Sequence, residues 1–383
     1  MMAVVVGDNL IPELTKYGVE KSAQLCYNCG KCTAVCGLTE NGTAFPRKVI
    51  RLLQLGLKDE LVRSTEPWMC YYCGECSDTC PRGAEPGEIM MGVRRYLTAE
   101  YDVTGQSKRL YTSKKAIWTA ITIWFFIPIV LIGVLHAIGN ASVVTSEVKL
   151  NEFAPVDIIN EAAHVYLIYL SIILLSGMFR MWRKVMDPKG LDYNVKISDY
   201  VREIGTSAVN IITIKKWLNC GDDTRLRWFK HYYLAVSYVT MFVVIVVFLK
   251  WFQTDNIYPI TNPQRWIGYI ATLGLLIGTI DALIGRMRKK EELHKHSHHT
   301  DWMFPITVLL VTITGILTHI LRYAGLPWPT YIVYTIHLGF TAVMLSTEVG
   351  IGKWTHIFYR PLGLYLDGVK KRASARNAQM VGN

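Results

Sequence analysis

Residues 26–36 read CYNCGKCTAVC, and residues 70–80 read CYYCGECSDTC, with Pro81 directly after the second stretch. Both stretches have the spacing Cys-x2-Cys-x2-Cys-x3-Cys. Gaps of two residues let three thiolates close on three corners of one cube of iron and sulfur, while the fourth thiolate reaches a second cube. Zinc more commonly takes two separated pairs of ligands. The repeated run therefore predicts two [4Fe–4S] clusters and not two zinc sites.

Each cluster is expected to take three cysteines from one run and the fourth from the other. Gly30 and Gly74 fall inside the runs, where the lack of a Cβ lets the backbone wrap closely around a cluster. Two clusters in one small domain would lie close enough to exchange single electrons. The predicted ligands are Cys26, Cys29, Cys32 and Cys80 for the first cluster, and Cys70, Cys73, Cys76 and Cys36 for the second.

The segments around the two runs predict helices. Residues 46–55, PRKVIRLLQL, have apolar side chains at helical spacing, and Pro46 suits a first helical turn. A second helix is expected over residues 86–100. The helical spacer between the runs favours an all-helical two-cluster ferredoxin over a compact β-type one. The predicted cysteine domain covers residues 1–112.

The character of the sequence changes after residue 112. Six apolar spans follow, each of about 20 residues or more, the length needed to cross a bilayer. Trp, Tyr or charged residues flank each span, as expected at a membrane interface. Six such spans are too many for the buried helices of a soluble protein. Residues 113–360 are therefore predicted to form a transmembrane bundle, and residues 361–383 a basic tail. The spans are expected at 116–138, 157–180, 230–252, 265–286, 302–323 and 331–355.

The basic residues predict how the chain is oriented. Of the 383 residues 51% are hydrophobic, and the net charge of +11 comes largely from segments between the spans, such as 181–229 and 287–301. In segment 139–156, Lys149 is the only Lys or Arg residue, and segment 253–264 holds no Lys or Arg. Loops that are rich in Lys and Arg stay on the cytoplasmic side of the membrane. A multi-pass protein of the inner membrane is expected, with both termini and the cysteine domain in the cytoplasm. Nucleic acid is not an expected partner.

Five histidines lie in or at the ends of the apolar spans. A polar ring is costly to place inside lipid, so each of these histidines is a candidate for a functional role. Facing imidazoles across a helical bundle are typical of haem b ligation. His231 near the start of the third span and His356 at the end of the sixth should form an inner pair. His337, roughly 28 Å of helix before His356, should lie near the outer face. Its partner is His164 or His319, and the sequence does not choose between them.

Two segments resemble the last helix of the di-haem cytochrome b subunit of respiratory nitrate reductases. They are Ile336-His337-Leu338-Gly339-Phe340 and Lys353-Trp354-Thr355-His356-Ile357-Phe358. His231, within Trp228-Phe229-Lys230-His231, resembles a haem ligand on another helix of that family. The second histidine of that helix would fall near Met241, whose thioether is expected to pack and not to ligate. The sixth ligand of the outer haem is therefore open.

The cysteine domain resembles the C subunit of heterodisulfide reductases, a helical two-cluster ferredoxin. Its fusion to a cytochrome b resembles the membrane-bound C subunit of the quinone-interacting membrane-bound oxidoreductase (Qmo) complexes of sulfate reducers. That resemblance implies two haems b, menaquinone as substrate, and flavin- and iron–sulfur-containing partners that resemble the A subunit of heterodisulfide reductases. It also implies electron delivery towards adenylylsulfate reductase.

The expected function is that of an electron-transfer subunit in a quinone-dependent oxidoreductase complex. It would oxidise menaquinol and pass electrons through two haems b and two [4Fe–4S] clusters to soluble flavoprotein partners. The alternative within this class is the membrane subunit of a complex that reduces a heterodisulfide or a sulfur carrier. A cluster-bearing anchor without haem and a redox-driven transporter are competing classes. Transporters usually have broken helices and acidic sites at mid-membrane, and only Asp281 and Glu348 are available here.

Quinol oxidation needs a proton acceptor near the outer haem. Polar residues at that level could instead be ordinary interface charges and anchors. Asp281 and Glu348 lie deeper, where they would either serve a proton path or pair with a neighbouring helix. Cys220 stands outside both cysteine runs, and a buried inert thiol is expected there. The candidate quinone-site residues are Asp157, Glu161, Arg322 and Tyr323.

Overall fold

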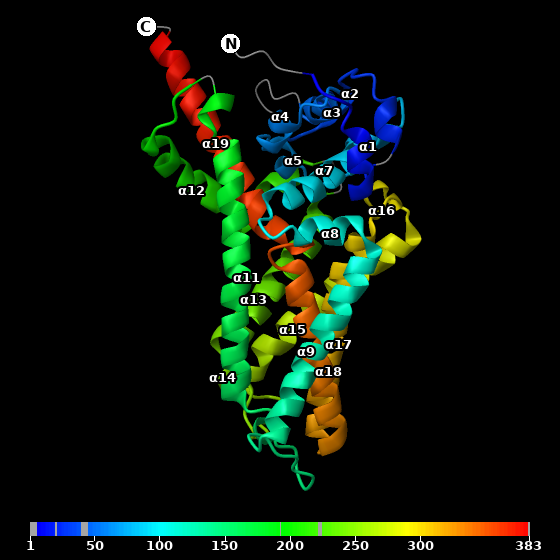
Figure 1. Ribbon diagram of the computed structural model, residues 1–383, viewed down its shortest axis with the longest axis vertical. Helices are drawn as coiled ribbons and strands as arrows, with labels where there is room; N and C mark the ends of the chain where they lie inside the picture. Colours follow the sequence, from blue (N-terminus) through cyan, green and yellow to red (C-terminus); the bar gives the residue numbers. More distant parts are fainter. Residues whose placement is uncertain (1–5, 20, 40–44, 192, 221–223, 382–383) are drawn as a thin grey trace.

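The computed structural model describes residues 6–19, 21–39, 45–191, 193–220 and 224–381. These parts of the chain are helical and contain no β-strand, as the sequence predicts. A long bundle of helices carries a compact head at one end, and the first and last described segments of the chain both lie at that end (Figure 1).

Short helices build the head. The predicted helix of residues 46–55 forms as α3, and Val49, Ile50 and Leu53 on its apolar face are buried. The predicted helix of residues 86–100 forms as α7, with Pro86 in its first turn. The head helices are α1 (Ile11–Leu14), α2 (Lys31–Val35), α3 (Arg47–Gln54), α4 (Lys58–Val62), α5 (Glu66–Met69), α6 (Glu75–Asp78), α7 (Pro86–Tyr101) and α8 (Gln106–Thr112).

The head shares its hydrophobic core with the membrane part. Trp68 and Tyr101 from the head pack in one buried cluster with Met181 and Tyr359 from later in the chain. The ring centres of Trp68 and Tyr359 lie 5.4 Å apart. Burying a large apolar side chain contributes about 1.5–3 kcal/mol, so this shared core fixes the head on the end of the bundle.

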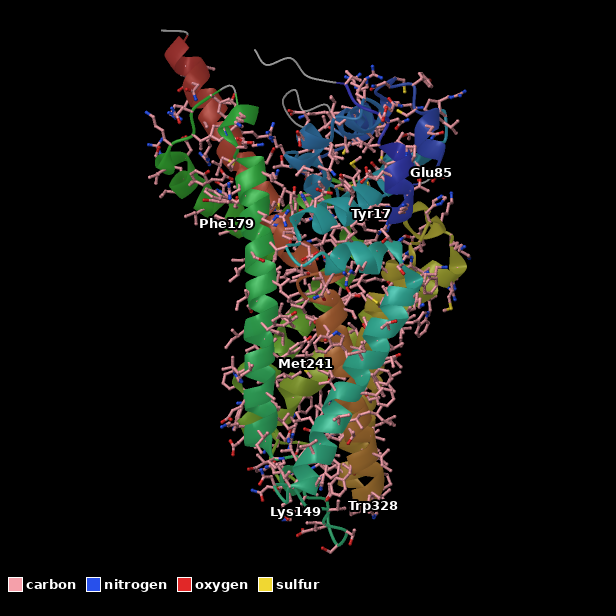
Figure 2. All side chains as sticks on the ribbon, in the orientation of Figure 1. Tyr17, Glu85, Lys149, Phe179, Met241 and Trp328 are labelled. Carbon is pink, nitrogen blue, oxygen red and sulfur yellow. The ribbon has the colours of Figure 1, made fainter. Side chains whose placement is uncertain are left out.

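Six helices of the described chain are long and apolar enough to cross a membrane, which confirms the predicted number of spans. Their outward side chains are apolar and exposed, as helices that face lipid require; Trp118 and Val165 are examples. Figure 2 shows Met241 at mid-height of this bundle, with Lys149 and Trp328 at the end far from the head. The six helices are α9 (Lys114–Ala137), α11 (Val156–Val185), α13 (Thr224–Val247), α15 (Pro263–Arg288), α17 (His299–Tyr323) and α18 (Pro327–Glu348), and α10 (Leu150–Phe153), α14 (Leu249–Phe252) and α16 (Glu292–Lys295) are short connecting helices.

The prediction of one continuous helix over 331–355 is wrong. The last span, α18, ends at Glu348, and His356 begins a separate helix, α19 (His356–Val381). Gly350 has a φ of 84°, a left-handed conformation that a helix interior does not allow. His337 and His356 therefore lie on different helices, and the chain turns between them.

The C-terminal helix α19 packs beside the head against α12 (Ile197–Thr213) (Figure 1). Residues 361–381 of the predicted basic tail form most of α19, and Leu366 among them is fully buried. Its basic side chains have acidic partners on α12; the Nε atom of Arg372 lies 2.5 Å from the Oε2 atom of Glu203. The proposed division of the chain at residues 112 and 360 stays a prediction.

Candidate functional site

The two cysteine runs repeat one backbone conformation. The residue two positions after the first cysteine has a positive φ in each run, 67° at Asn28 and 58° at Tyr72. The glycine two positions later also has a positive φ, 87° at Gly30 and 96° at Gly74, which a residue without a Cβ adopts at no steric cost. Helices α2 and α6 begin directly after these glycines. The duplication in sequence is thus a duplication of local structure.

The fourth cysteine of the second run lies with the first three of the first run. Cys26, Cys29, Cys32 and Cys80 line one cavity in the head. Burial raises the pKa of Cys26, and the neighbouring Cys80 and Cys29 raise it further because like charges would be crowded together.

The fourth cysteine of the first run lies with the first three cysteines of the second run. Burial raises the pKa of Cys36 to about 11, and the nearby Cys70 and Cys73 add to this shift. Burial also raises the pKa of Cys76, which lies close to Cys70, Cys73 and Cys36. The thiols of Cys36, Cys70, Cys73 and Cys76 therefore form the second group.

The donors in these groups suit iron–sulfur clusters. All nine cysteines of the chain are free thiols. Backbone N–H groups already donate to two of the sulfurs, from Tyr72 to Cys70 and from Ala84 to Cys80, both at 3.3 Å. Such hydrogen bonds favour the charged thiolate that a cluster needs. Among the described residues, no three His, Cys, Asp or Glu side chains converge as ligands of a single metal ion do.

Two buried arginines hold the start of the second run. The side chains of Arg94 from α7 and Arg360 from α19 both donate to the carbonyl oxygen of Cys70. Arg360 also lies over the ring of Tyr71, 4.2 Å from its centre. Burial, together with the charge of Arg360, lowers the pKa of Arg94 to about 9. These arginines bring positive charge next to the second group of cysteines.

A cavity of about 510 Å³ lies where the head meets the bundle. This volume falls in the range of about 300–1,000 Å³ that is usual for sites of organic ligands and cofactors. The rings of His231 and His356 both line it, and so do Cys73 and Tyr71 of the second cysteine run. The predicted inner histidine pair thus shares one cavity with a predicted cluster ligand.

The two rings present free nitrogen atoms. The Nδ1 atom of His356 lies 2.5 Å from the carbonyl oxygen of Lys353. A carbonyl can only accept, so Nδ1 carries the proton and Nε2 is left with a lone pair for a metal. Burial lowers the pKa of His356 to about 3, which keeps the ring neutral. The Nδ1 atom of His231 has no hydrogen-bond partner in the described part of the chain. Chemically, this cavity suits a bis-histidine haem.

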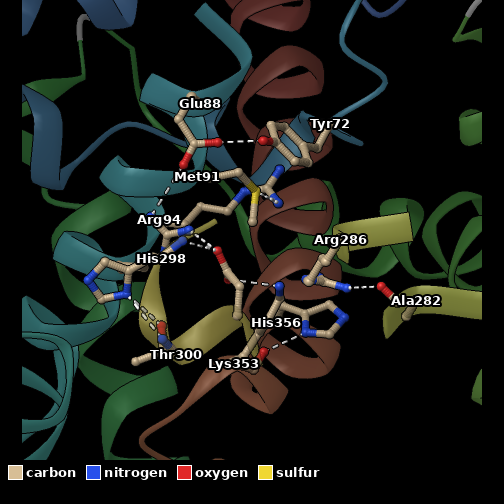
Figure 3. A network of polar contacts seen from close by, with 12 residues as sticks. Tyr72, Glu88, Met91, Arg94, Ala282, Arg286, His298, Thr300, Lys353 and His356 are labelled. Carbon is tan, nitrogen blue, oxygen red and sulfur yellow. Dashed lines mark hydrogen bonds and ion pairs between the residues drawn. The ribbon is translucent and has the colours of Figure 1, made fainter. Parts of the chain in front are cut away.

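Figure 3 shows a buried ionic network beside this cavity. The hydroxyl of Tyr72 donates to Glu88, and Glu88 lies 3.7 Å from Arg95. Arg95 donates to Asp301 on α17, which also accepts from the Nζ atom of Lys353 at 2.8 Å. Charges of both signs alternate along the network, so each buried charge has an opposite neighbour, as burial demands.

The predicted outer histidines lie on three different helices. His337 on α18 uses its Nδ1 atom, which lies 3.1 Å from the carbonyl oxygen of Val311. The Nδ1 atom of His164 on α11 likewise lies 2.7 Å from the carbonyl oxygen of Asn160. The Nε2 atom of His319 instead lies 3.1 Å from the hydroxyl of Tyr269. No hydrogen bond or ring contact joins His337 to His164 or His319 in the described chain.

Met241 lies in apolar surroundings. Its side chain packs at the edge of a buried apolar cluster that includes Tyr238, Leu275 and Met344. This is the packing role that the sequence predicts.

The structure separates the four candidate quinone-site residues into two groups. Asp157 lies 2.6 Å from the Nζ atom of Lys250, and Glu161 is close enough to influence the same lysine. Arg322 donates to the carbonyl oxygens of Thr254 and Asn256, and Tyr323 donates to that of Tyr258. Asp157 and Glu161 belong to a set of charges at the start of α11, which is the end far from the head. Arg322 and Tyr323 hold the 254–258 segment in place.

Several residues of the site were not found by sequence reasoning. Arg94 and Arg95 stand next to each other in a helix that was predicted, and Arg360 follows His356 by one helical turn, which places both on one face. Trp217 packs against the ring of His231, with 4.8 Å between ring centres. The two adjacent arginines in this helix were an available signal, whereas no local pattern marked Trp217.

The fold and site define a class: a multi-pass membrane protein with a helical iron–sulfur head. Residues 25–85 match the family described as 4Fe-4S dicluster domain. The head resembles the C subunit of heterodisulfide reductases, which supports an electron-transfer iron–sulfur subunit of an oxidoreductase complex.

Individual relatives are similar to the chain over different lengths. A protein of Archaeoglobus profundus that is similar to the C subunit of heterodisulfide reductase is 35% identical over 94 residues, 24% of this chain and 50% of the relative. The iron-sulfur C subunit of the CoB--CoM heterodisulfide reductase of Methanopyrus kandleri is 45% identical over 73 residues, 19% of this chain and 38% of the relative. Citrate utilization protein B of Escherichia coli is 26% identical over 217 residues, 52% of this chain and 53% of the relative. The chain thus spans about half or less of the length of these relatives. No solved structure matches the chain.

Proposed function

We propose that the chain is a membrane electron-transfer subunit that oxidises menaquinol. Electrons would pass through two haems b and two [4Fe–4S] clusters to soluble partners that carry flavin and iron–sulfur clusters and resemble the A subunit of heterodisulfide reductases. The acceptor at the end of this route would be adenylylsulfate reductase, and the membrane subunit would be of the Qmo type.

One observation carries this proposal: the cavity that holds His231 and His356 also reaches Cys73 of the second cysteine group. A haem held by those two rings would lie directly beside a cluster, so an electron need not cross the head to pass between them. The free lone pair on the Nε2 atom of His356 supports this assignment. A bound haem b would supply reversible one-electron chemistry.

The buried arginines would act on both cofactors. Arg94 and Arg360 line the cavity and also reach Cys70, so their charges lie between the two sites. Positive charge stabilises the more negative reduced state of a nearby cluster and also binds carboxylates, which a haem carries as propionates. These side chains would therefore position one cofactor and favour reduction of the other.

The second haem would lie further from the head, with His337 as one ligand. We assign His164 as its partner, because His164, His337 and His356 all have Nδ1 within hydrogen-bond reach of a carbonyl oxygen and leave Nε2 free. His319 has its Nε2 engaged by Tyr269. A carbonyl partner on the second ring nitrogen is the usual arrangement of a ligating histidine.

Quinol would react at the end of the bundle far from the head. Asp157 and Glu161 at the start of α11 are the proposed proton acceptors, with Lys250 holding Asp157. Arg322 and Tyr323 would act indirectly, since their hydrogen bonds fix the 254–258 segment that borders the same end. Cytoplasmic exposure of the head is part of the proposal, and the basic loops next to it support this orientation.

The test is the haem and iron content per chain of the purified protein, with a reduced-minus-oxidised visible spectrum. Two b-type haems and about eight iron atoms in clusters are expected, and a menaquinol analogue should reduce the haems first. Clusters without a b-type spectrum would overturn the haem assignment and leave an iron–sulfur anchor.

A second candidate is the membrane subunit of a complex that reduces a heterodisulfide or a sulfur carrier. The likeness of the head to heterodisulfide reductase iron-sulfur subunits favours it. The two candidates share every residue assigned above and differ only in the electron acceptor. Oxidation of the reduced protein by purified flavoprotein partners, with either a heterodisulfide or adenylylsulfate reductase as final acceptor, distinguishes them.

A further inference from the structure

Cys220 lies outside both cysteine runs, yet the fold brings it to the second group. Its side chain is 3% exposed and packs with Leu38 and Tyr71, close to Cys36 and Cys73. Its thiol is a neighbour of the thiol of Cys73, within reach of a hydrogen bond. Two cysteines that are 147 positions apart in sequence therefore meet at the sulfur that a cluster would use.

We propose that Cys220 is a positioning residue of the second cluster, whose S–H group donates a hydrogen bond to the iron-bound sulfur of Cys73. This inference rests on the proposed cluster assignment. A thiolate bound to iron has no proton to give, so Cys220 must be the donor in that pair. The apolar surroundings of Cys220, which include Ile214 and Trp217, also favour a neutral thiol over a charged one.

A hydrogen-bonded turn places this thiol. The turn starts at Ile214, where φ is 51°, and the short 3-10 helix Lys215–Asn219 follows. The backbone N–H of Cys220 donates to the carbonyl oxygen of Trp217 at 3.0 Å. The backbone N–H of Lys216 donates to the side chain of Asn210 at 3.0 Å, which ties the turn to α12.

Trp217 places the turn between the two proposed cofactor sites. Its ring stacks on Tyr71, with 5.5 Å between the centres and 23° between the planes. The ring of Trp217 also meets the ring of His231 edge to face, with 4.8 Å between the ring centres. Aromatic pairs of this kind are a favourable arrangement that adds to the gain from burial alone. Trp217 thus holds the turn against the second cysteine run on one side and against a predicted haem ligand on the other.

The backbone directly after the first cysteine run lies very close to the turn. A Cβ atom at Gly37, directly after Cys36, would lie 2.0 Å from the carbonyl oxygen of Asn219. No side chain fits there, so the turn and the second group require a glycine at this position to approach each other. This close backbone approach is an independent sign that residues 215–220 belong to the cluster site.

The expected consequence is a higher reduction potential for the second cluster. Hydrogen bonds to cluster sulfurs stabilise the reduced state, which carries more negative charge. The second group is the one that borders the cavity of His231 and His356. The S–H donor of Cys220 would therefore favour electron transfer from that cavity into the head.

The experiment compares Cys220→Ala, which removes the donor, with Cys220→Ser, which keeps an O–H donor, in the full-length protein. Redox titrations followed by electron paramagnetic resonance measure the midpoint potentials of both clusters. We expect Cys220→Ala to lower the potential of one cluster, Cys220→Ser to stay near the unaltered protein, and the other cluster to be unchanged in both. If Cys220→Ala does not fold, Cys220→Val fills the space without a donor and takes its place.

The outcomes separate this inference from the proposed function. Unchanged potentials in Cys220→Ala, or equal shifts in the Ala and Ser variants, overturn the hydrogen-bond role. A loss of about four iron atoms in both variants would make Cys220 a cluster ligand and would also overturn it. If the unaltered protein binds no clusters, the cluster assignment itself fails. Iron and sulfide contents, measured on each sample, tell these cases apart.

Discussion

The guanidinium of Arg95 lies 2.5 Å from the carboxylate of Asp301, between its Nη2 and Oδ2 atoms. The first residue belongs to α7 of the head and the second to membrane helix α17, 206 positions later in the chain. Both side chains are almost completely buried, and Lys353 and Glu88 complete the charge balance around them. The head is thus joined to the bundle by an ionic contact as well as by an apolar core.

Replacing Arg95 with Met should loosen the head. The substitution leaves Asp301 buried with a weaker set of partners, and removing one member of a buried pair typically costs about 3–5 kcal/mol. The expected result is a lower thermal midpoint and faster proteolysis between the head and α9, measured in detergent. Lys58→Met is the matched control, since it breaks a more exposed pair with Glu100 that is worth about 0–1 kcal/mol. Equal losses in the two variants would contradict the role of the buried pair.

Single serine substitutions test the crossed cysteine grouping. Cys36→Ser should damage the cluster held by Cys70, Cys73 and Cys76, although Cys36 belongs to the other run. Cys80→Ser should damage the other cluster, because Cys80 shares a cavity with the first run. Electron paramagnetic resonance of the reduced variants identifies which cluster signal is lost. If Cys36→Ser instead removed the signal that depends on Cys26, the grouping would be wrong.

Substitution of single histidines tests the haem assignment. His356→Ala should remove the haem nearer the head, and His337→Ala should remove only the other one, because His356 lines the cavity beside the head and His337 does not. Each variant should keep about eight cluster iron atoms. Haem content and low-temperature visible spectra provide the measurement. Loss of both haems in either variant, with the protein still folded, would speak against two separate sites.

A comparison of His164 and His319 tests the ligand of the outer haem. His164→Ala should abolish the haem that depends on His337. His319→Ala should retain it, because the Nε2 atom of His319 is engaged by the hydroxyl of Tyr269. Both variants can be examined by haem content after purification in the same detergent. The reverse pattern would assign His319 as the ligand.

Much of the fold was available from local sequence patterns. The cysteine spacing determined the chemistry of the head, since thiolates two residues apart can reach one cluster wherever the rest of the chain goes. Apolar length determined the six spans, because a bilayer of fixed thickness requires about 20 apolar residues per helix. Helices α3 and α7 followed from periodicity and from prolines suited to a first turn.

The break between Glu348 and His356 could not be found from hydropathy. Residues 349–352 read VGIG and continue the apolar pattern, so the end of the helix depends on the left-handed backbone of Gly350 and not on polarity. A span prediction that counts apolar residues therefore runs through this turn.

Only the tertiary structure decided which distant side chains meet. Arg95 and Asp301, Cys220 and Cys73, and Trp217 and His231 are pairs whose members lie far apart or on different elements. Their contact depends on how α12, α19 and the head pack onto the ends of the membrane helices, and no local pattern encodes that. The sequence by itself determined the iron–sulfur head and the six candidate spans, because ligand spacing and apolar length are local properties. The fold decided which of the predicted sites adjoin one another, because contacts between remote residues arise from packing.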